Sequence, residues 1–298
     1  MANIVLAHPV FLAQDPVEAA AASPYFPLGL LYLASYVREH GHEVTVFDGT
    51  FEADESSFAE HLRAHRPQVV GLSALVTTRS TALRLARTAA DFGAVVVLGG
   101  PDPTAEPAMY LVDEAVDIVV HHEGEQTITR ILDLLDVQQL TVEQLADEPG
   151  IAFRHDGSVR VNHPRPPMQN LDVLPLPARD LIDMERYLHQ WQDDQGYSSI
   201  TVATSRGCPY NCEWCRDAVH GAGFRQRSPD SVAAEMRELK ERYGVESIRL
   251  VDDVDGLSRE WIDDWADAAE RLDAVIPFEA LGRLERDDLP LLEVRDSL

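Results

Sequence analysis

The sequence is poor in cysteine and almost without lysine. Only three of the 298 residues are cysteines, and Lys240 is the one lysine among 25 basic residues. Three thiols exclude a disulfide-built scaffold, because such scaffolds pair their cysteines and need several bridges. The chain also lacks any run of about 18 uncharged apolar residues, so we expect no membrane span. No basic segment precedes the apolar stretch at the N-terminus, which predicts a strand instead of a signal peptide and favours a cytoplasmic protein.

Positive charge is scarce throughout the chain. The sequence has 51 acidic against 25 basic residues, a net charge of -26, and the acids are spread instead of forming a tail. Such a surface repels polyanions, so we expect no nucleic-acid partner. Two interpretations of the charge stay open: a merely soluble surface, and an acidic composition adapted to high salt, where screening reduces self-repulsion.

The first half of the chain alternates short apolar strands with amphipathic helices. Strands are expected at 3–8, 43–47, 69–73, 94–98 and 116–120, and helices at 28–40, 56–65, 78–92 and 126–135. Continuous apolar strands between such helices predict a parallel sheet covered on both faces. We therefore expect a doubly wound, Rossmann-like α/β domain over residues 1–149, with ligands at the carboxyl ends of its strands.

The alternation of strands and helices is interrupted between residues 150 and 195 and resumes afterwards. A hairpin is expected around Asp156-Gly157, followed by a proline-rich stretch that we interpret as an ordered connector. From 196 to 298 a second βα series is expected, with strands at 199–204, 247–251 and 277–281 and helices at 229–243 and 258–272. Ser228 and Ser258 are the expected N-caps of these two helices.

The three cysteines lie within eight positions, in the segment TSRGCPYNCEWC. Structural zinc usually takes four protein ligands, for which His220 is the nearest fourth candidate after Cys208, Cys212 and Cys215. Cubane iron–sulfur clusters are normally held by four thiolates, so a cluster held by three has one iron open to an external molecule. The spacing favours the cluster, and zinc remains the alternative.

The Cys208-x3-Cys212-x2-Cys215 segment, which follows a strand that opens a βα series, resembles the signature of radical S-adenosylmethionine enzymes. Other segments resemble the branch in which a cobalamin-binding domain precedes the radical domain: PLGLLYLASYVREHGHEVTVFD, VVLGGPDPTAEP, HHEGEQT, LDVLPLPARDLID, RQRSPDSVAAE and LVDD. The resemblance covers nearly the whole chain. It implies a cobalamin-binding type of Rossmann-like domain followed by a TIM-like radical barrel.

The resemblance also implies an activity. A [4Fe–4S] cluster cleaves S-adenosylmethionine to a 5′-deoxyadenosyl radical, and cobalamin assists, for example, C-methylation of an unactivated carbon in a small-molecule substrate. An electron donor such as ferredoxin or flavodoxin is implied as a partner. Three alternatives stay open: an oxidative cyclase acting on a tetrapyrrole, which WCRDAVHGAGFRQRSP also resembles, a non-catalytic cobalamin-binding protein, and a zinc-stabilised structural protein.

The barrel expected from the sequence is partial. Barrels of this family normally close about six βα units, and only three strands are expected before Leu298. An unclosed barrel leaves a strand edge unpaired. A fragment, a shortened member and a second chain that completes the barrel are all compatible with this pattern, and the substrate cannot be inferred from it.

The resemblance also implies residues that contact the cofactors, although no catalytic residue can be assigned. Those expected at S-adenosylmethionine are Tyr210, Trp214, Asp252, Asp253, Glu279 and Arg283; Arg225 and Arg227 are candidates for cofactor or substrate anions. For each, packing, helix capping or surface pairing is the alternative interpretation. The Gly-Gly-Glu segment of many radical enzymes is absent, and Asp252-Asp253 stands in its region.

For cobalamin, the implied contacts lie at the ends of two strands. They are Gly99, Gly100, Asp102, Glu123 and Gly124, where glycine lets a flat macrocycle approach the backbone. No aspartate is followed by histidine two places on, so the Asp-x-His-x-x-Gly motif that ligates cobalt is absent. His8, His121 and His122 are further candidates near strand ends, and ordinary structural histidines are the alternative.

Overall fold

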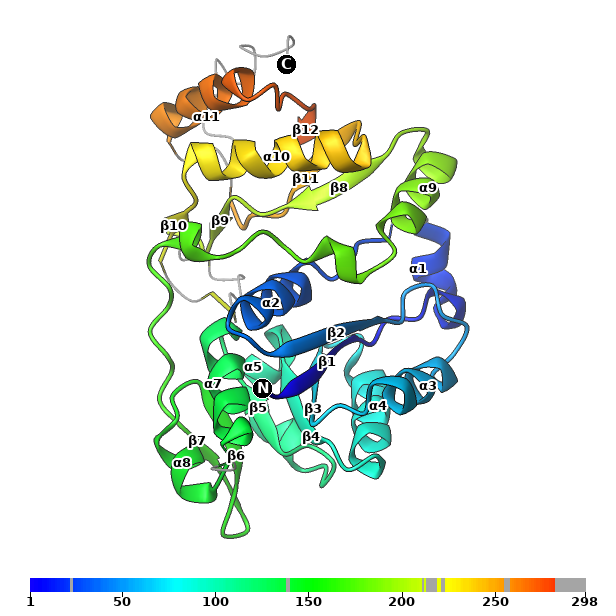
Figure 1. Ribbon diagram of the computed structural model, residues 1–298, viewed down its shortest axis with the longest axis vertical. Coiled ribbons are helices and arrows are strands. Elements are labelled where there is room, and N and C mark those ends of the chain that lie inside the picture. Colours follow the sequence, from blue (N-terminus) through cyan, green and yellow to red (C-terminus); the bar gives the residue numbers. More distant parts are fainter. Residues whose placement is uncertain are drawn as a thin grey trace.

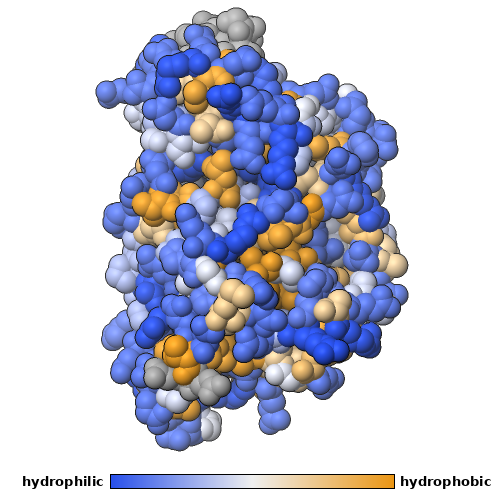
Figure 2. All heavy atoms as spheres, viewed as in Figure 1, coloured by the Kyte–Doolittle hydropathy of each residue, from blue (hydrophilic) through white to orange (hydrophobic). Residues whose placement is uncertain are grey.

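A computed structural model describes residues 1–21, 24–137, 140–210, 212, 219–220, 223–254 and 258–281. In this part of the chain a seven-stranded sheet and a three-stranded sheet form two layers, which Figure 1 shows at the bottom and top of the molecule. Hydrophilic side chains cover most of the face seen in Figure 2, with smaller hydrophobic areas between them. None of the described helices combines the length and apolar character that crossing a bilayer requires.

The seven-stranded sheet has the order β2-β1-β3-β4-β5-β6-β7. Its strands are β1 (Asn3–His8), β2 (Glu43–Asp48), β3 (Val69–Ser73), β4 (Val95–Gly99), β5 (Ile118–Val120), β6 (Ile151–His155) and β7 (Ser158–Val161). The first five are parallel, and β6 and β7 are antiparallel to their neighbours. After β2 the chain crosses to the other side of β1, so the topological switch point lies between β1 and β3, where open α/β sheets bind ligands.

Helices cover both faces of this sheet, which confirms the predicted doubly wound domain. On one face lie α2 (Leu28–Glu39) and α7 (Glu125–Asp136), and on the other α3 (Ser56–His65), α4 (Arg79–Asp91) and α6 (Pro107–Leu111). Strand β1 shows why both faces must be covered. Its successive residues Leu6 and Ala7 are buried in two different hydrophobic clusters, because neighbouring side chains of a strand point to opposite faces of the sheet.

The expected hairpin forms and belongs to the same sheet. Strand β6 pairs with β5, and the turn between β6 and β7 has positive φ at Asp156 and Gly157. Short helices that the sequence analysis did not identify complete this part: α1 (Pro16–Ala21), α5 (Pro101–Ala105) and α8 (Val142–Asp147). The proposed domain boundary after residue 149 stays a prediction.

The second layer contains β8 (Ser199–Val202), α10 (Pro229–Tyr243), β11 (Ser247–Leu250), α11 (Arg259–Arg271) and β12 (Phe278–Glu279). The strands are parallel in the order β12-β11-β8, as in the opening of a βα barrel. The predicted N-caps are confirmed: Ser228 accepts a hydrogen bond from the Ser231 amide, and Ser258 accepts one from the Trp261 amide.

The end of the proline-rich connector is a helix that the sequence analysis did not predict. Helix α9 (Met184–Gln195) begins at Asp183, whose side chain caps the Arg186 amide, and ends at Gly196 in the left-handed conformation. Its buried residues Met184, Tyr187 and Leu188 join the cluster that also contains residues of α2, β8 and α10. One continuous hydrophobic core therefore links the two layers.

A fully buried carboxylate fixes the connector against the second layer. Glu235 of α10 is 0% exposed and binds Arg179 of the connector at 2.5 Å and Arg227, which precedes α10. Burial by itself raises the pKa of a carboxyl, but the two arginines outweigh it and hold the pKa of Glu235 below its usual range. Removing either partner of such a buried pair is costly, because the remaining charge is neither paired nor solvated by water.

Replacing Glu235 by glutamine is therefore expected to destabilise the protein by about 3 kcal/mol or more, because it leaves two buried guanidinium groups without a counter-charge. Urea unfolding measures the loss. The matched control is Glu241→Gln on the same helix, whose exposed pair with Arg237 is worth less than about 1 kcal/mol. Equal stabilities of the two variants would contradict the assigned role of Glu235.

Candidate functional site

A cavity of about 350 Å³ opens at the carboxyl edge of the seven-stranded sheet. The ends of β1, β3, β4 and β5 and the first turns of α2 surround it, so it lies at the topological switch point. Residues of the second layer complete its rim: Arg206, Val219 and His220. The cavity thus lies where the two parts of the chain meet.

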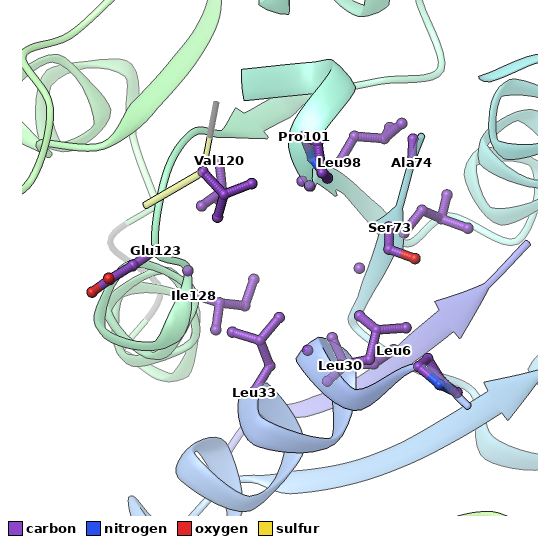
Figure 3. A pocket seen from close by; sticks show the side chains of 18 of the residues that line it. Leu6, Leu30, Leu33, Ser73, Ala74, Leu98, Pro101, Val120, Glu123 and Ile128 are labelled. Carbon is purple, nitrogen blue, oxygen red and sulfur yellow. The ribbon is translucent and has the colours of Figure 1, made fainter. Parts of the chain in front are cut away.

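The walls of the cavity are mainly apolar. Leu33 of α2, Val120 of β5 and Ile128 of α7 point into it (Figure 3). Leu6 and Leu98 of the sheet also line it. The signal for Leu33 was present in the apolar spacing of residues 28–40, but periodicity does not distinguish a side chain that lines a cavity from one that fills a core.

Each of the three predicted glycines lines the cavity. Gly100 has φ of 105°, and a Cβ there would lie 2.9 Å from the Ala74 carbonyl oxygen, so this glycine is required by the backbone itself. A Cβ on Gly124 would come within 3.2 Å of Leu33 Cδ2 and press on the wall. At Gly99 the nearest atom to a Cβ is 3.5 Å away, which is ordinary contact.

Besides His220 on the rim, His8 and His122 line the cavity. Within the part of the chain that the structure describes, the Nδ1 atom of His8 is buried without a hydrogen-bond partner, and burial lowers the pKa of its imidazole, with the opposing effect of Asp48 smaller. His8 is therefore neutral and has an unused polar atom. His122 has φ of 63°, and its Nδ1 lies 3.2 Å from the Val219 carbonyl oxygen of the second layer. His121 also has a buried nitrogen without a partner, but it does not line this cavity.

The predicted cobalamin contact Asp102 is bound to protein groups. Both of its carboxylate oxygens accept hydrogen bonds from Arg79, each at 2.7 Å, and Oδ2 also accepts one from the Tyr110 hydroxyl at 2.5 Å. Asp102 is buried, and these bonds join α4, α5 and α6. Its role toward a cofactor stays a prediction.

The predicted contact Glu123 is also bound to protein groups, all from segments far along the chain. Arg225 Nη1 lies 2.5 Å from Oε1, His220 Nδ1 lies 3.6 Å from the same oxygen, and Arg206 Nη1 lies 3.7 Å from Oε2. The Met168 amide donates to Oε2 at 3.1 Å. Although burial raises the pKa of a carboxyl, these donors outweigh it and lower the pKa of Glu123 to about 2.

The cysteine segment leaves and re-enters the second layer through a pair of short strands. They are β9 (Ser205–Arg206) and β10 (Arg225–Gln226), which pair antiparallel with Arg206 opposite Arg225. Cys208 and Cys212 are partly buried and form no disulfide. The predicted cluster ligand Cys215 and its neighbour Trp214 lie outside the described residues, so the structure places two of the three thiols.

The residues predicted at S-adenosylmethionine are only partly brought together. Asp252 is buried at the end of β11 and accepts hydrogen bonds from the Thr204 amide (2.8 Å), the Thr204 hydroxyl (2.5 Å) and the Ser205 amide (2.7 Å). It thereby fixes the backbone immediately before β9. Tyr210 and Glu279 are exposed, and Glu279 lies 3.4 Å from the Tyr197 hydroxyl. Arg283 lies outside the described residues.

The other two arginine candidates serve the protein scaffold. Arg225 binds Glu123 and donates to the Met168 carbonyl oxygen at 2.9 Å. Arg227 binds Glu235 and donates to the Ala203 carbonyl oxygen at 2.9 Å. Both side chains are buried, so neither is a solvated surface charge.

Fold and site together define a cofactor-binding α/β protein: a doubly wound domain with an apolar cavity at its switch point, joined to the opening of a βα barrel that carries three closely spaced cysteines. A family model described as B12 binding domain matches residues 15–132. This range begins after β1 and contains β2 to β5, all of α2, the greater part of α7 and most of the cavity lining.

Sequence similarity to known proteins extends beyond this domain to most of the chain. It is 34% identical over 259 residues to an uncharacterized methyltransferase of Pyrococcus horikoshii, covering 84% of this chain and 54% of the relative. It is 28% identical to the anaerobic magnesium-protoporphyrin IX monomethyl ester cyclase of Synechocystis, covering 97% and 55%. The chain thus spans about half the length of these curated relatives. It belongs to the cobalamin-binding-domain-containing radical S-adenosylmethionine family, as the sequence analysis predicted.

A solved structure has the same fold. The structure of the cobalamin-dependent S-adenosylmethionine radical enzyme OxsB with aqua-cobalamin and S-adenosylmethionine bound superimposes with a TM-score of 0.76. It shares 18% sequence identity and covers 93% of this chain and 38% of OxsB. The predicted fold class is confirmed by this match and by the parallel strands of both layers.

Proposed function

We propose that this chain carries the cobalamin site and the [4Fe–4S] site of a radical S-adenosylmethionine methyltransferase that methylates an unactivated carbon of a small molecule. One observation carries the proposal: strands β9 and β10, which flank the three cysteines, pack on the rim of the apolar cavity in the B12-binding domain. Two cofactor sites on one rim suit a reaction in which both cofactors act on one substrate.

The residues of the cavity fit cobalamin. Leu33, Val120 and Ile128 offer an apolar enclosure for a macrocycle, and Gly99 and Gly124 let it approach the backbone. The Nδ1 of the neutral His8, which has no partner among the described residues, is a polar atom that a ligand in the cavity can use. When bound, cobalamin would supply the methyl group; the protein binds it, orients it and excludes water.

The cysteine segment fits an iron–sulfur cluster with one open iron. Cys208 and Cys212 are partly buried thiols outside any disulfide, and Asp252 fixes the backbone that leads to them. We include Cys215 as the third ligand by its spacing. The cluster would supply the electron that cleaves S-adenosylmethionine. Tyr210, Trp214, Asp253, Glu279 and Arg283 remain the proposed contacts of S-adenosylmethionine, whereas the bonds of Asp252 favour a role in positioning the segment.

Anaerobic reconstitution of the chain tests this function. Supporting results are ~4 irons per chain, uptake of hydroxocobalamin, and release of 5′-deoxyadenosine from S-adenosylmethionine under dithionite. Cobalamin uptake without cleavage favours a cobalamin-binding protein, and one bound zinc without a visible chromophore favours a structural site. An electron donor such as ferredoxin or flavodoxin would replace dithionite in the cell.

An oxidative cyclase acting on a tetrapyrrole is the second candidate. The observation that favours it is the match to a magnesium-protoporphyrin IX monomethyl ester cyclase over 97% of this chain. The two candidates differ in the fate of the methyl group. Methyl transfer from labelled S-adenosylmethionine into a product supports the methyltransferase, and ring formation without label supports the cyclase.

A further inference from the structure

The rim of the cavity contains a buried ionic cluster that joins the two layers of the molecule. Glu123 comes from the turn between β5 and α7, Glu125 is the first residue of α7, and Arg206 and Arg225 belong to β9 and β10. The side chains of all four are at most 11% exposed. Ion pairs shielded from water in this way depend strongly on each partner, because an unpaired buried charge is costly.

Glu123 is the member of this cluster that contacts both strands. It binds Arg225 of β10 at 2.5 Å and lies 3.7 Å from Arg206 of β9, while Glu125 binds Arg206, at 2.5 Å. The Met168 amide of the connector also donates to Glu123. One carboxylate of the B12-binding domain thus joins the connector and both strands that flank the cysteines.

Glu123 lines the rim of the cavity, but its carboxylate is turned away from the interior. In Figure 3 its carboxylate points away from the space into which Leu33 and Ile128 point. Its partners Arg225 and Met168 belong to β10 and the connector and do not line the cavity, whereas Arg206 also lines the rim. A contact with a cofactor in the cavity would require Glu123 to give up these bonds.

We propose that Glu123 is a positioning residue that docks β9 and β10 on the rim of the cavity, and that it makes no contact with cobalamin. Through these strands it sets the position of Cys208 and Cys212 relative to the cavity. The effect on the position of the cysteines rests on the proposed function, because it concerns the distance between two cofactors. The docking itself is a property of the protein without cofactors.

The test compares Glu123→Gln with the wild-type chain. Glutamine keeps the shape and can still accept from the Met168 amide, but it cannot balance the charge of Arg225. Amide hydrogen exchange of the cofactor-free protein is expected to speed up at least ~10-fold in 205–210 and 223–227, because docking no longer opposes local opening. Affinity for hydroxocobalamin is expected to stay within ~3-fold, that is within about 0.7 kcal/mol.

The matched control is Glu148→Gln. Glu148 is equally buried, binds Arg165 and lies 3.7 Å from Arg130, but it does not touch β9 or β10. Exchange in 205–210 and 223–227 should not change in this variant. Should Glu123→Gln fail to fold, Arg225→Gln removes the same pair from the other side and must show the same faster exchange.

A spectroscopic measurement distinguishes a role of Glu123 in positioning the cysteine segment from a general loss of stability. In protein with reduced cluster and cob(II)alamin, Glu123→Gln should broaden the distribution of distances obtained from their magnetic dipolar coupling, and Glu148→Gln should not. Unchanged exchange in Glu123→Gln, an unchanged dipolar spectrum, or a ~10-fold or greater loss of cobalamin affinity each overturns the proposal. If the wild-type chain binds neither cofactor, the proposed function fails, while the exchange experiment still decides on the docking.

Discussion

Replacing Cys208, Cys212 and Cys215 together by alanine is expected to reduce the iron content of the reconstituted chain from ~4 per chain to background, because the cubane loses all of its protein ligands. Release of 5′-deoxyadenosine should fall below detection with it. Iron and sulfide analysis, EPR of the reduced protein and product analysis measure the effect. No other cysteine exists in the chain to replace the lost thiolates.

The control for this variant is cobalamin binding. Most of the cavity residues lie in the seven-stranded layer, so affinity for hydroxocobalamin should be retained when the thiols are removed. A His220→Ala variant tests the zinc alternative, since loss of bound metal on removing this side chain would point to a fourth protein ligand. A triple variant with the spectrum and iron content of wild type would end the proposal of a cluster.

Replacing Leu33 by tryptophan is expected to weaken binding of hydroxocobalamin by ~100-fold or more, or about 2.7 kcal/mol. Leu33 points into the cavity from α2 (Figure 3), so the larger indole occupies space that the macrocycle needs. Leu33 is only partly buried and the cavity offers room, so the fold should accept the larger side chain at a cost of about 1–3 kcal/mol or less. Spectrophotometric titration measures the affinity.

Leu33→Met is the matched control, because it nearly conserves volume and should bind cobalamin with an affinity close to that of wild type. Leu33→Trp should also keep its iron–sulfur cluster, since the cysteines lie in the other layer. Normal cobalamin affinity of a folded Leu33→Trp protein would place the cofactor outside this cavity. The triple cysteine variant is therefore expected to lose the cluster and keep cobalamin binding, and Leu33→Trp is expected to lose cobalamin binding and keep the cluster.

Local patterns were sufficient for most of the two βα series. Helices α3 and α10 begin and end at the predicted residues, and Ser228 caps α10 as expected, because a cap and a periodic apolar face are both local features. The sequence predicts an irregular connector where α9 forms, although Asp183 and Gly196 mark the ends of the helix. The prolines before it exclude a regular helix in their own stretch, and this favours a connector for the whole segment.

Strands β9 and β10 illustrate what local patterns do not contain. Each has only two residues, so no alternation of apolar side chains can reveal it. Their pairing joins residues on the two sides of the cysteine segment, and long-range ion pairs hold them to the B12-binding domain. Such short strands form because tertiary contacts hold them, and their own sequence does not predict them.

The sequence by itself determined the alternation of strands and helices, the spacing of three thiols and the membership of the family, because all of these depend on residue type and order. Only the tertiary structure decided which protein groups the acidic residues bind. The sequence predicts Asp102, Glu123 and Asp252 as cofactor contacts, and the fold binds Asp102 to Arg79, Glu123 to Arg225 and Asp252 to Thr204. A carboxylate takes its role from the donors within about 4 Å of it, and the fold brings these donors from distant parts of the chain.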